Sequence, residues 1–457
     1  MSPRCAWLGA PHRFKVWLLL AMIWPLCAAT ANDGIPPAAG RLQPSVACQA
    51  SPSHSYALYL PKAYREDRLW PVLFVFSPSG EGAEAAALYQ AGAERLGWIV
   101  VASNDARNGP RGPIQVAQAA LWKEVFDHLK ADPKRVYASG FSGGARMSMD
   151  LAEDHRSSLQ GLLSIGAFGS SRTLGPDHLA HVLLCGEEDF NQAELAASWR
   201  RLRSAKGRQL WMEHYPGGHA WAPAQLIEEG MVFLDLAAGL QGLHPRDPAA
   251  EAAFLQRRLE AARVGMNAED LAQISRRWQD IAALPGAPAE AQQQVRSLAK
   301  DPGVLAAQSL EQSYPERAAR LRSATAYGAE LQRLLSVAAS KGTEAIDARR
   351  LLERERGALE ERCVEALAKE AWEAEIPLAR GLVALGDRGS RGGVYLAMAL
   401  AHLGRKEEAL VELKAAITRG YRPSRPLAEL PLLAPLREEP SFKTIDVQPR
   451  QTGVPSH

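Results

Sequence analysis

The first half of the chain alternates short apolar runs with longer helix-like stretches, and this alternation restricts the fold more than any other feature. It extends from Tyr56 to about Leu240. Continuous apolar runs such as residues 71–76 suit strands that are buried on both faces. Strands of this kind, separated by helices, predict a parallel sheet that helices cover on both faces. In such sheets, functional side chains collect in loops at the carboxyl ends of the strands.

The alternation gives each expected element definite bounds. The expected strands are residues 55–60, 71–76, 98–102, 135–138, 161–165, 181–185 and 209–214. The expected helices are residues 83–96, 114–130 and 143–155. The sequence therefore predicts an α/β fold for this half.

One glycine-rich turn in this half presents a serine. Residues 140–144 read Gly-Phe-Ser-Gly-Gly, between an expected strand and an expected helix. In a G-x-S-x-G turn of this kind, the serine hydroxyl is lifted above the sheet, and the small flanking residues let the backbones approach. The backbone N–H of Gly143, at the start of the helix, would face an oxyanion. The pattern predicts Ser142 as a nucleophile.

A nucleophilic serine needs a base and a group that orients the base, and two later loops offer them. His219 follows the last expected strand in the run Gly-Gly-His-Ala-Trp, and Asp189 follows the preceding strand in Gly-Glu-Glu-Asp. Both loops lie at the carboxyl ends of their strands. Ser142, Asp189 and His219 are therefore the predicted catalytic residues.

Three neighbouring residues remain alternatives to these choices. His214 is a rival base, but it falls inside an expected strand, where a structural role is favoured. Glu187 and Glu188 are rival orienting groups, but they lie nearer the end of their strand than Asp189 does.

The loop after residues 71–76 is expected to supply a second donor to the oxyanion. It reads Ser-Pro-Ser-Gly-Glu-Gly, and the backbone N–H of Gly80 or Glu81 suits this position. The loop differs from the His-Gly pattern of many hydrolases, which leaves the choice between these two donors open.

Four residues are candidates to bind substrate. Asn104, Arg107 and Asn108 lie in the loop after residues 98–102 and face the same rim of the sheet, although Asn and Gly there are equally typical of a turn. Trp221, two residues after His219, is the fourth candidate.

These motifs resemble those of the α/β-hydrolase superfamily, specifically its secreted esterase and polyester-depolymerase-like branch. Residues 141–145 read Phe-Ser-Gly-Gly-Ala, residues 186–189 form a Gly-x-x-Asp turn, and residues 217–221 place Gly-Gly-His before a Trp. The order Ser, Asp, His is also that of the superfamily. The resemblance implies ester hydrolysis by a serine triad through an acyl-enzyme, without a cofactor. Because the superfamily also includes peptidases, thioesterases and inactive scaffolds, it indicates a reaction class better than a substrate.

The composition changes near residue 240, which predicts a second, helical region. We place the hydrolase-like domain at residues 45–240 and a linker at residues 241–249, where two prolines and a glycine interrupt the chain. Residues 250–390 form the helical domain, with helical periodicity at Ile274 and Trp278.

Residues 391–457 are expected to form a helix pair and a C-terminal tail. The pair resembles a tetratricopeptide repeat, because Gly404 falls at the turn, and Ala409 and Ala416 are small where the helices would cross. The helical half is interpreted either as a structural appendage or as a concave surface that binds a protein partner or the cell envelope.

The N-terminus has the features of a secretory signal peptide, residues 1–31. A basic head precedes the apolar run of residues 16–23, and residues 29–31 offer an Ala-x-Ala cleavage pattern. Pro25 shortens the run well below the roughly 20 apolar residues of a membrane span. We expect an exported protein, periplasmic or extracellular, without a stable membrane span; an uncleaved anchor is the alternative.

The charge argues against nucleic acid as a partner. Lys and Arg number 53 and Asp and Glu 51, and a formal net charge of +2 over 457 residues provides no basic field. The densest basic stretch, residues 200–208, is interpreted as the solvated face of a helix. No Cys/His cluster has metal-ligand spacing, so we expect neither a metal site nor a cofactor.

The cysteines leave two alternatives open. Cleavage after residue 31 would leave Cys48, Cys185 and Cys363, too few for a disulfide framework. One bridge between Cys48 and Cys185 and a set of buried free thiols are equally favoured.

Two classes of function follow from the sequence. The leading one is a secreted serine hydrolase acting on a small-molecule or polymeric carboxylic ester. The alternative is an envelope protein-interaction scaffold with helical repeats and a degenerate hydrolase domain; a serine peptidase is less favoured. A complete set of triad residues in the required order favours the hydrolase.

Overall fold

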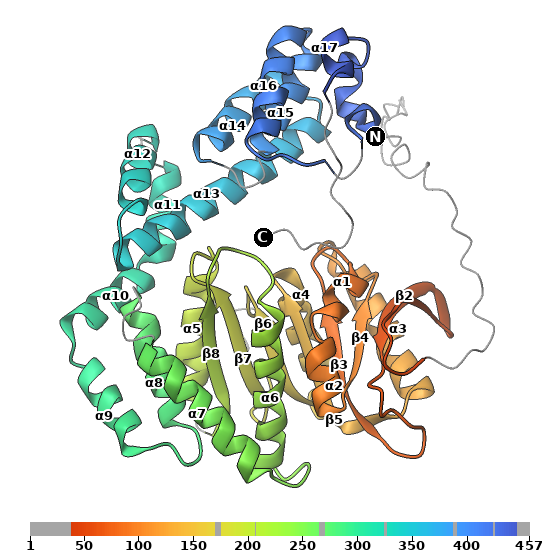
Figure 1. Ribbon diagram of the computed structural model, residues 1–457, viewed down its shortest axis with the longest axis vertical. Helices are drawn as coiled ribbons and strands as arrows, with labels where there is room; N and C mark the ends of the chain where they lie inside the picture. The colour runs from red at the N-terminus through yellow and green to blue at the C-terminus, as the bar shows by residue number, and fades with distance from the viewer. Residues whose placement is uncertain are drawn as a thin grey trace, which may run out of the picture. The chain divides into compact units, whose positions relative to one another are not determined.

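The computed structural model describes residues 38–169, 175–205, 207–264, 270–323, 327–386, 391–423 and 426–445. The described chain forms a sheet flanked by helices and then continues as helices (Figure 1). The predicted signal peptide, residues 1–31, lies outside the described residues. None of the helices in the described ranges is long and apolar enough to cross a membrane.

A single sheet carries the first half of the described chain, with eight strands in the order β1-β2-β4-β3-β5-β6-β7-β8. Its strands are β1 (Gln43–Cys48), β2 (Ser51–Tyr59), β3 (Trp70–Phe76), β4 (Ile99–Ser103), β5 (Ala131–Phe141), β6 (Leu159–Ile165), β7 (Ala180–Gly186) and β8 (Leu210–Tyr215). All pairings from β4 to β8 are parallel. The prediction of a parallel sheet is confirmed for this part.

One edge of the sheet differs from the prediction. Strand β2 pairs antiparallel with β4, and the unpredicted strand β1 pairs antiparallel with β2. The connection from Cys48 to Ser51 is a tight turn, which permits only antiparallel pairing. Most of β1 is exposed or half-buried, so the strand lacks the apolar run by which the others are found.

Helices cover both faces of the sheet. On one face lie α1 (Gly82–Ala87), α2 (Gln90–Leu96) and α6 (Ala224–Leu240); on the other lie α3 (Arg111–His128), α4 (Gly143–Asp154) and α5 (Gln192–Ser204). Strand β3 shows why its sequence is apolar throughout: Val72 and Phe74 pack into the core on one face, and Leu73 and Val75 into the core on the other.

The helix expected over residues 83–96 is interrupted. It forms two helices, α1 and α2, because the chain turns at Leu88 and Tyr89. The turn brings Tyr89 into the core, where its hydroxyl lies 2.6 Å from Ser139 Oγ of β5. Helical periodicity continues through the break, so the sequence alone does not reveal it.

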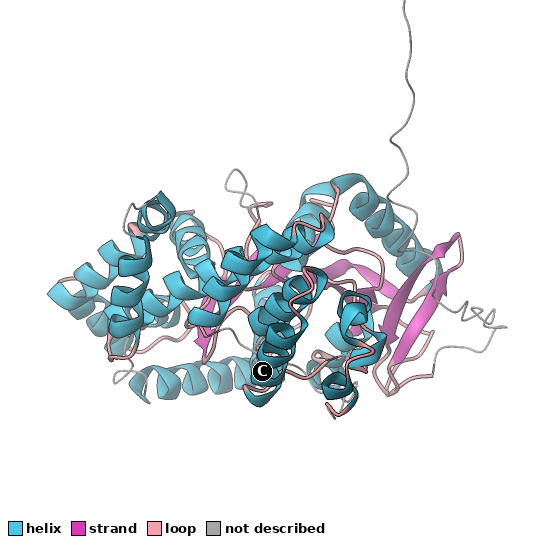
Figure 2. Cartoon of the chain, turned by 90° about the horizontal axis from the view of Figure 1, so that it is seen from above, coloured by secondary structure: helices cyan, strands magenta, loops and turns pink. Residues whose placement is uncertain are grey.

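The second half of the described chain is helical, and in Figure 2 its helices are drawn in cyan. They are α7 (Pro248–Val264), α8 (Leu271–Ala282), α9 (Ala289–Leu298), α10 (Pro302–Gln312), α11 (Tyr314–Ser323), α12 (Tyr327–Ala338), α13 (Thr343–Ala368), α14 (Trp372–Ala384), α15 (Arg391–His402) and α16 (Lys406–Thr418). Two 3-10 helices, η2 (Leu427–Glu429) and η3 (Pro431–Leu436), and the short α17 (Pro440–Lys443) follow.

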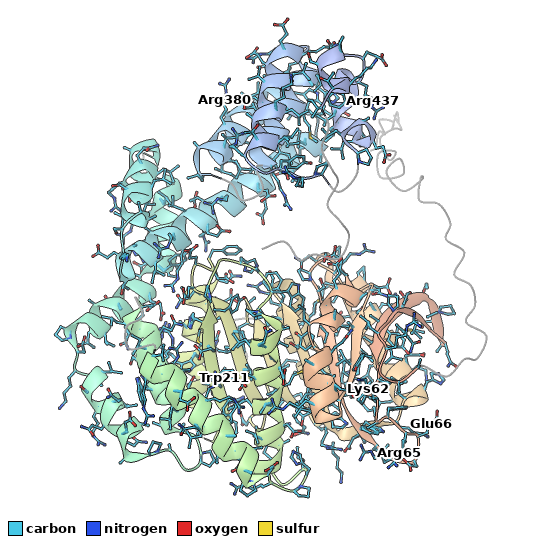
Figure 3. All side chains as sticks on the ribbon, in the orientation of Figure 1. Lys62, Arg65, Glu66, Trp211, Arg380 and Arg437 are labelled. Atoms are coloured by element: carbon cyan, nitrogen blue, oxygen red, sulfur yellow. The ribbon has the colours of Figure 1, made fainter. Side chains whose placement is uncertain are left out.

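Helix α7 packs directly on the last strand of the sheet. Trp211 of β8, labelled in Figure 3, meets Phe254 of α7 edge-on, with ring centroids 5.6 Å apart. The guanidinium carbon of Arg258, one turn further along α7, lies 4.8 Å from the centroid of the Trp211 ring. The helical half therefore continues the core of the sheet.

The basic stretch of residues 200–208 is not the solvated face that the sequence predicted. Arg200 pairs with Glu311 of α10, and Arg203 pairs with Asp280 of α8. Asp280 also accepts from the backbone N–H of Met212 in β8. These arginines join α5 to the helical half, because the buried carboxylates require cations.

All three cysteines of the described chain are free and buried: Cys48, Cys185 and Cys363. Of the two alternatives left by the sequence, the structure has the free thiols. Burial raises the pKa of the Cys185 thiol well above its ordinary value, which keeps the thiol protonated.

Candidate active site

Ser142 lies at a sharp turn between β5 and α4. Its backbone has φ 54° and ψ −119°, a conformation that costs a non-glycine residue free energy and is concentrated at functional sites. The N–H of Ser142 donates to the carbonyl of Ile165 on the neighbouring strand β6, at 2.8 Å. The sheet therefore holds the serine in this conformation.

The glycines on either side permit a close approach of three backbones. A Cβ on Gly144 would lie 2.0 Å from the carbonyl oxygen of Phe76, at the end of β3. A Cβ on Gly140 would lie 2.4 Å from the carbonyl carbon of Gly144. Only glycine fits at these two positions, which is the physical basis of the small residues in the sequence pattern.

The structure brings the three predicted catalytic residues together in one hydrogen-bonded chain. Ser142 Oγ lies 2.9 Å from Nε2 of His219. The other ring nitrogen of His219, Nδ1, lies 2.9 and 3.0 Å from the carboxylate oxygens of Asp189. Asp189 is fully buried, and the backbone N–H of Asn191 donates to its Oδ1 at 2.8 Å.

Two aromatic rings fix the imidazole of His219. The ring of Phe141 lies 4.6 Å from it, and the ring of Phe190 lies 4.3 Å from it, between centroids. The sequence pattern assigned neither phenylalanine a role, although each is the immediate neighbour of a predicted catalytic residue.

The rival residues are placed elsewhere. His214 is buried in β8, and burial lowers the pKa of its imidazole well below the ordinary value. The Glu188 carboxylate lies 2.9 Å from Nε of Arg349 on α13. Burial raises the pKa of Glu187, and the charge of Arg350 opposes that rise. Of these three carboxylates, that of Asp189 is the one hydrogen-bonded to His219.

The first turn of α4 offers backbone N–H groups beside Ser142, because the first N–H groups of a helix have no partner within it. Gly143 is the first residue of this turn. Of the two candidates for the second oxyanion donor, the N–H of Gly80 donates to the carbonyl of Ser77 at 3.2 Å, within its own turn. That bond argues against Gly80 and leaves Glu81, the N-cap residue of α1.

The candidates for substrate binding fall into different roles. Asn104 does not face the rim, because its side-chain amide donates to Ser55 Oγ and to the Pro44 carbonyl and so ties the loop to the antiparallel edge. Asn108 lies at the site: a Cβ on Gly143 would be 1.8 Å from its Oδ1.

Arg107 and Trp221 complete the set of candidates. Arg107 is exposed, and its Cβ lies 3.5 Å from the position that a Cβ on Gly80 would take. Trp221 is half-buried, with its ring 5.4 Å from that of Phe141 and 6.4 Å from that of Tyr89. Trp221 therefore supports the aromatic packing around His219. Among the residues that the structure describes, no group of three His, Cys, Asp or Glu side chains is arranged to hold a metal ion.

Comparison with solved structures finds esterases and other serine hydrolases. A thermostable esterase matches at 14% identity and a TM-score of 0.32, over 41% of this chain and 58% of that chain, which is less than two thirds of its length. An esterase from Pyrobaculum calidifontis matches at 14% identity and a TM-score of 0.34, over 45% of this chain and 86% of that chain. The likeness is low in each case.

A third match has similar values. It is the S-formylglutathione hydrolase FrmB from Staphylococcus aureus, at 13% identity and a TM-score of 0.36, over 44% of this chain and 99% of that chain. Comparison with protein-family models found no match, and neither did comparison with curated proteins.

Proposed function

We propose that this protein is a secreted serine hydrolase that cleaves carboxylic esters through an acyl-enzyme. The observation that supports it is the continuous chain of hydrogen bonds from Ser142 Oγ through His219 to the buried carboxylate of Asp189. A serine, an imidazole and a carboxylate in this order form an activated nucleophile, in which the carboxylate holds the imidazole with its proton on Nδ1.

In the proposed first half-reaction, Nε2 of His219 accepts the hydroxyl proton of Ser142 while Oγ bonds to the ester carbonyl carbon. The carbonyl oxygen becomes an oxyanion, and its electron pair then re-forms the carbonyl as the bond to the alkoxy group breaks. His219 gives its proton to the departing alkoxy group, so an alcohol leaves and the acyl group stays on Ser142.

In the second half-reaction, His219 takes a proton from water, and the resulting hydroxide adds to the acyl carbon. The bond to Ser142 Oγ breaks, His219 returns the proton to Oγ, and the carboxylic acid leaves. One water is consumed for each ester, and no cofactor is needed.

The oxyanion is proposed to lie against the first turn of α4. The N–H of Gly143, at the start of α4, supplies one donor, and the N–H of Glu81, in the loop that follows β3, is proposed as the second. The side chain of Asn108, against Gly143, is proposed as a polar contact for the substrate.

A fluorophosphonate probe tests the proposal, because it labels only an activated serine. We expect the wild-type protein to be labelled and Ser142→Ala to be unlabelled. Ser148→Ala is the matched control, since Ser148 lies on the same helix and donates to the Gly144 carbonyl rather than to the triad. A panel of esters and peptides on the same variants then separates an esterase from a peptidase.

The alternative, an interaction scaffold with a degenerate hydrolase half, gives the opposite result: no labelling of the wild-type protein. The helix pair α15 and α16 is still proposed to be repeat-like and to offer a surface to a protein partner. Gly404 between the helices has φ 77°, and Ala409 and Ala416 are fully buried where the helices pack.

A further inference from the structure

Two adjacent arginines of helix α13 contact the turn that carries Asp189. Nε of Arg350 donates to the backbone carbonyl of Glu187 at 2.6 Å. Nε of the preceding residue, Arg349, lies 2.9 Å from the carboxylate of Glu188. Consecutive residues of the helical half therefore hold consecutive residues of this turn, which we call the acid turn (residues 186–189).

The other side of the acid turn is held by the loop that carries His219. The N–H of Glu187 donates to the carbonyl of Tyr215, and the N–H of Glu188 donates to the carbonyl of Gly217, both at 2.9 Å. The acid turn thus lies between the histidine loop and α13. The N–H groups of Glu187 and Glu188 point to the histidine loop, and the carbonyl of Glu187 points to Arg350.

Arg350 is itself held rigidly. The residue is 4% exposed, and its Nη2 lies 2.9 Å from the carboxylate of Asp270. Asp270 is the N-cap of α8 and accepts from two backbone N–H groups there. Burial alone would raise the pKa of Asp270, but the guanidinium groups of Arg350 and Arg276 outweigh burial and hold that pKa at about 2. Arg350 therefore faces a permanent negative charge.

We infer that Arg350 is a positioning residue of the proposed triad, through which the helical half fixes the backbone of the acid turn and so the distance from Asp189 to His219. The inference rests on the proposed function. A charged donor at 2.6 Å from a backbone carbonyl is a strong hydrogen bond. The rigid fork of a guanidinium can serve this carbonyl and the Asp270 carboxylate at once, which a lysine ammonium cannot do in the same geometry.

Loss of Arg350 affects the triad in a definite way. The Glu187 carbonyl loses its donor and the buried Asp270 carboxylate loses its partner, so the acid turn relaxes. Asp189 follows two residues after Glu187 and moves with the turn. A displacement of about 1 Å costs on the order of 10²-fold in rate, and the loss falls on kcat rather than KM, because substrate does not touch Arg350.

The test compares Arg350→Met with Arg276→Met. Arg276 is equally buried, at 4% exposed, and its guanidinium pairs with Glu311 of α10, so its loss also removes a buried cation but leaves the acid turn its contacts. We expect Arg350→Met to lower kcat about 10²-fold with KM little changed, and Arg276→Met to retain kcat within about threefold. Equal losses in both variants, or full activity in Arg350→Met, would overturn the inference.

Arg350→Lys covers the case in which Arg350→Met does not fold. The lysine keeps the positive charge and one hydrogen bond, so we expect this variant to fold. Its kcat should lie between those of the wild type and Arg350→Met; if Arg350→Met does not fold, the kcat of Arg350→Lys should still be clearly below that of the wild type. A lysine variant with wild-type kcat would contradict a role for the guanidinium fork.

Proton NMR separates this inference from the proposed function. The hydrogen-bonded Nδ1 proton of His219 is expected to resonate far downfield of the amide protons. It should persist in the wild type and in Arg276→Met and should weaken or shift in Arg350→Met, whether or not the protein hydrolyses esters. An unlabelled wild type would refute the proposed hydrolase alone, whereas an unchanged resonance in Arg350→Met would refute the positioning role.

Discussion

His219 is hydrogen-bonded to both carboxylate oxygens of Asp189: its Nδ1 lies 3.0 Å from Oδ1 and 2.9 Å from Oδ2. The carboxylate has no exposed surface, while 15% of the His219 side chain is exposed. The carboxylate thus reaches the substrate only through the imidazole. This arrangement suits an orienting group and not a nucleophile.

Asp189→Asn is expected to lower kcat by about 10⁴-fold, because an amide favours the wrong tautomer of His219. Steady-state kinetics on a reactive ester provides the measurement. Glu187→Gln is the matched control, since Glu187 contributes its backbone and not its side chain to the site, and its kcat should stay near wild type. An active Asp189→Asn beside an inactive Glu187→Gln would reverse the assignment.

Gly144→Ala is expected to destabilise the protein by about 2 to 3 kcal/mol and to abolish labelling. The added Cβ would lie 2.0 Å from the Phe76 carbonyl, so β3 or the serine turn must move. Chemical denaturation measures the free energy of unfolding. Gly357→Ala in α13 is the control: nothing lies within 4 Å of its new Cβ, and we expect a gain of about 0.5 to 1 kcal/mol. A wild-type stability for Gly144→Ala would show that the backbones can separate freely.

Glu375 makes the stability of the helical half depend on pH. It is fully buried in α14, and burial raises its pKa from 4.5 to about 7, with the Cys363 thiol opposing the rise. Because the pKa of Glu375 is higher in the folded state, its protonated carboxyl stabilises the fold fully below about pH 4.5. This stabilisation is lost as the pH rises through about 7. Glu375→Gln should therefore raise the free energy of unfolding by roughly 2 kcal/mol at pH 8 and change it little at pH 4.

Thermal melts at the two pH values measure this difference. Glu373→Gln, an exposed position of the same helix, is the control and should change the melting temperature equally at both. A Glu375→Gln variant that is no more stable than wild type at pH 8 would rule out an ionised, buried Glu375.

Export predicts a specific N-terminus. If residues 29–31 are a processing site, mass spectrometry of the protein from a secreting host should find Asn32 as the first residue or close to it. Ala29→Glu and Ala31→Glu together should block processing, because the cleavage site requires small residues. Recovery of Met1 on the wild-type protein would support an anchor.

The sequence by itself determined the features that depend on local patterns. A sharp turn from a strand into a helix requires glycines on both sides of the serine. Residues 140–144 show this pattern, so Ser142 is recognisable without a structure. The apolar runs of β3 and β4 are found for a similar reason: a strand buried on both faces is largely apolar. The loops that follow β7 and β8 then favour Asp189 and His219, with Glu187, Glu188 and His214 as the alternatives.

The tertiary structure decided every feature that depends on a distant partner. Asn104 and Asn108 lie in the same loop and look alike in the sequence. The side-chain amide of Asn104 nevertheless donates to Ser55 Oγ and to the Pro44 carbonyl, and so it holds the edge strands. Arg200 and Arg203 resemble a solvated helix face until the carboxylates of Glu311 and Asp280 are brought to them. The positive charge of these arginines is evident from the sequence, but the carboxylates with which they pair are brought to them only by folding.

Arg350 shows most clearly which contacts a sequence pattern does not reveal. It is separated by 163 residues from Glu187, whose carbonyl it holds, and nothing in the run around it distinguishes it from the neighbouring arginines of α13. A sequence pattern records which face of a helix is apolar, because that depends on residues three and four apart. Which buried carbonyl a cation reaches depends on the packing of whole elements, and only the folded chain establishes it.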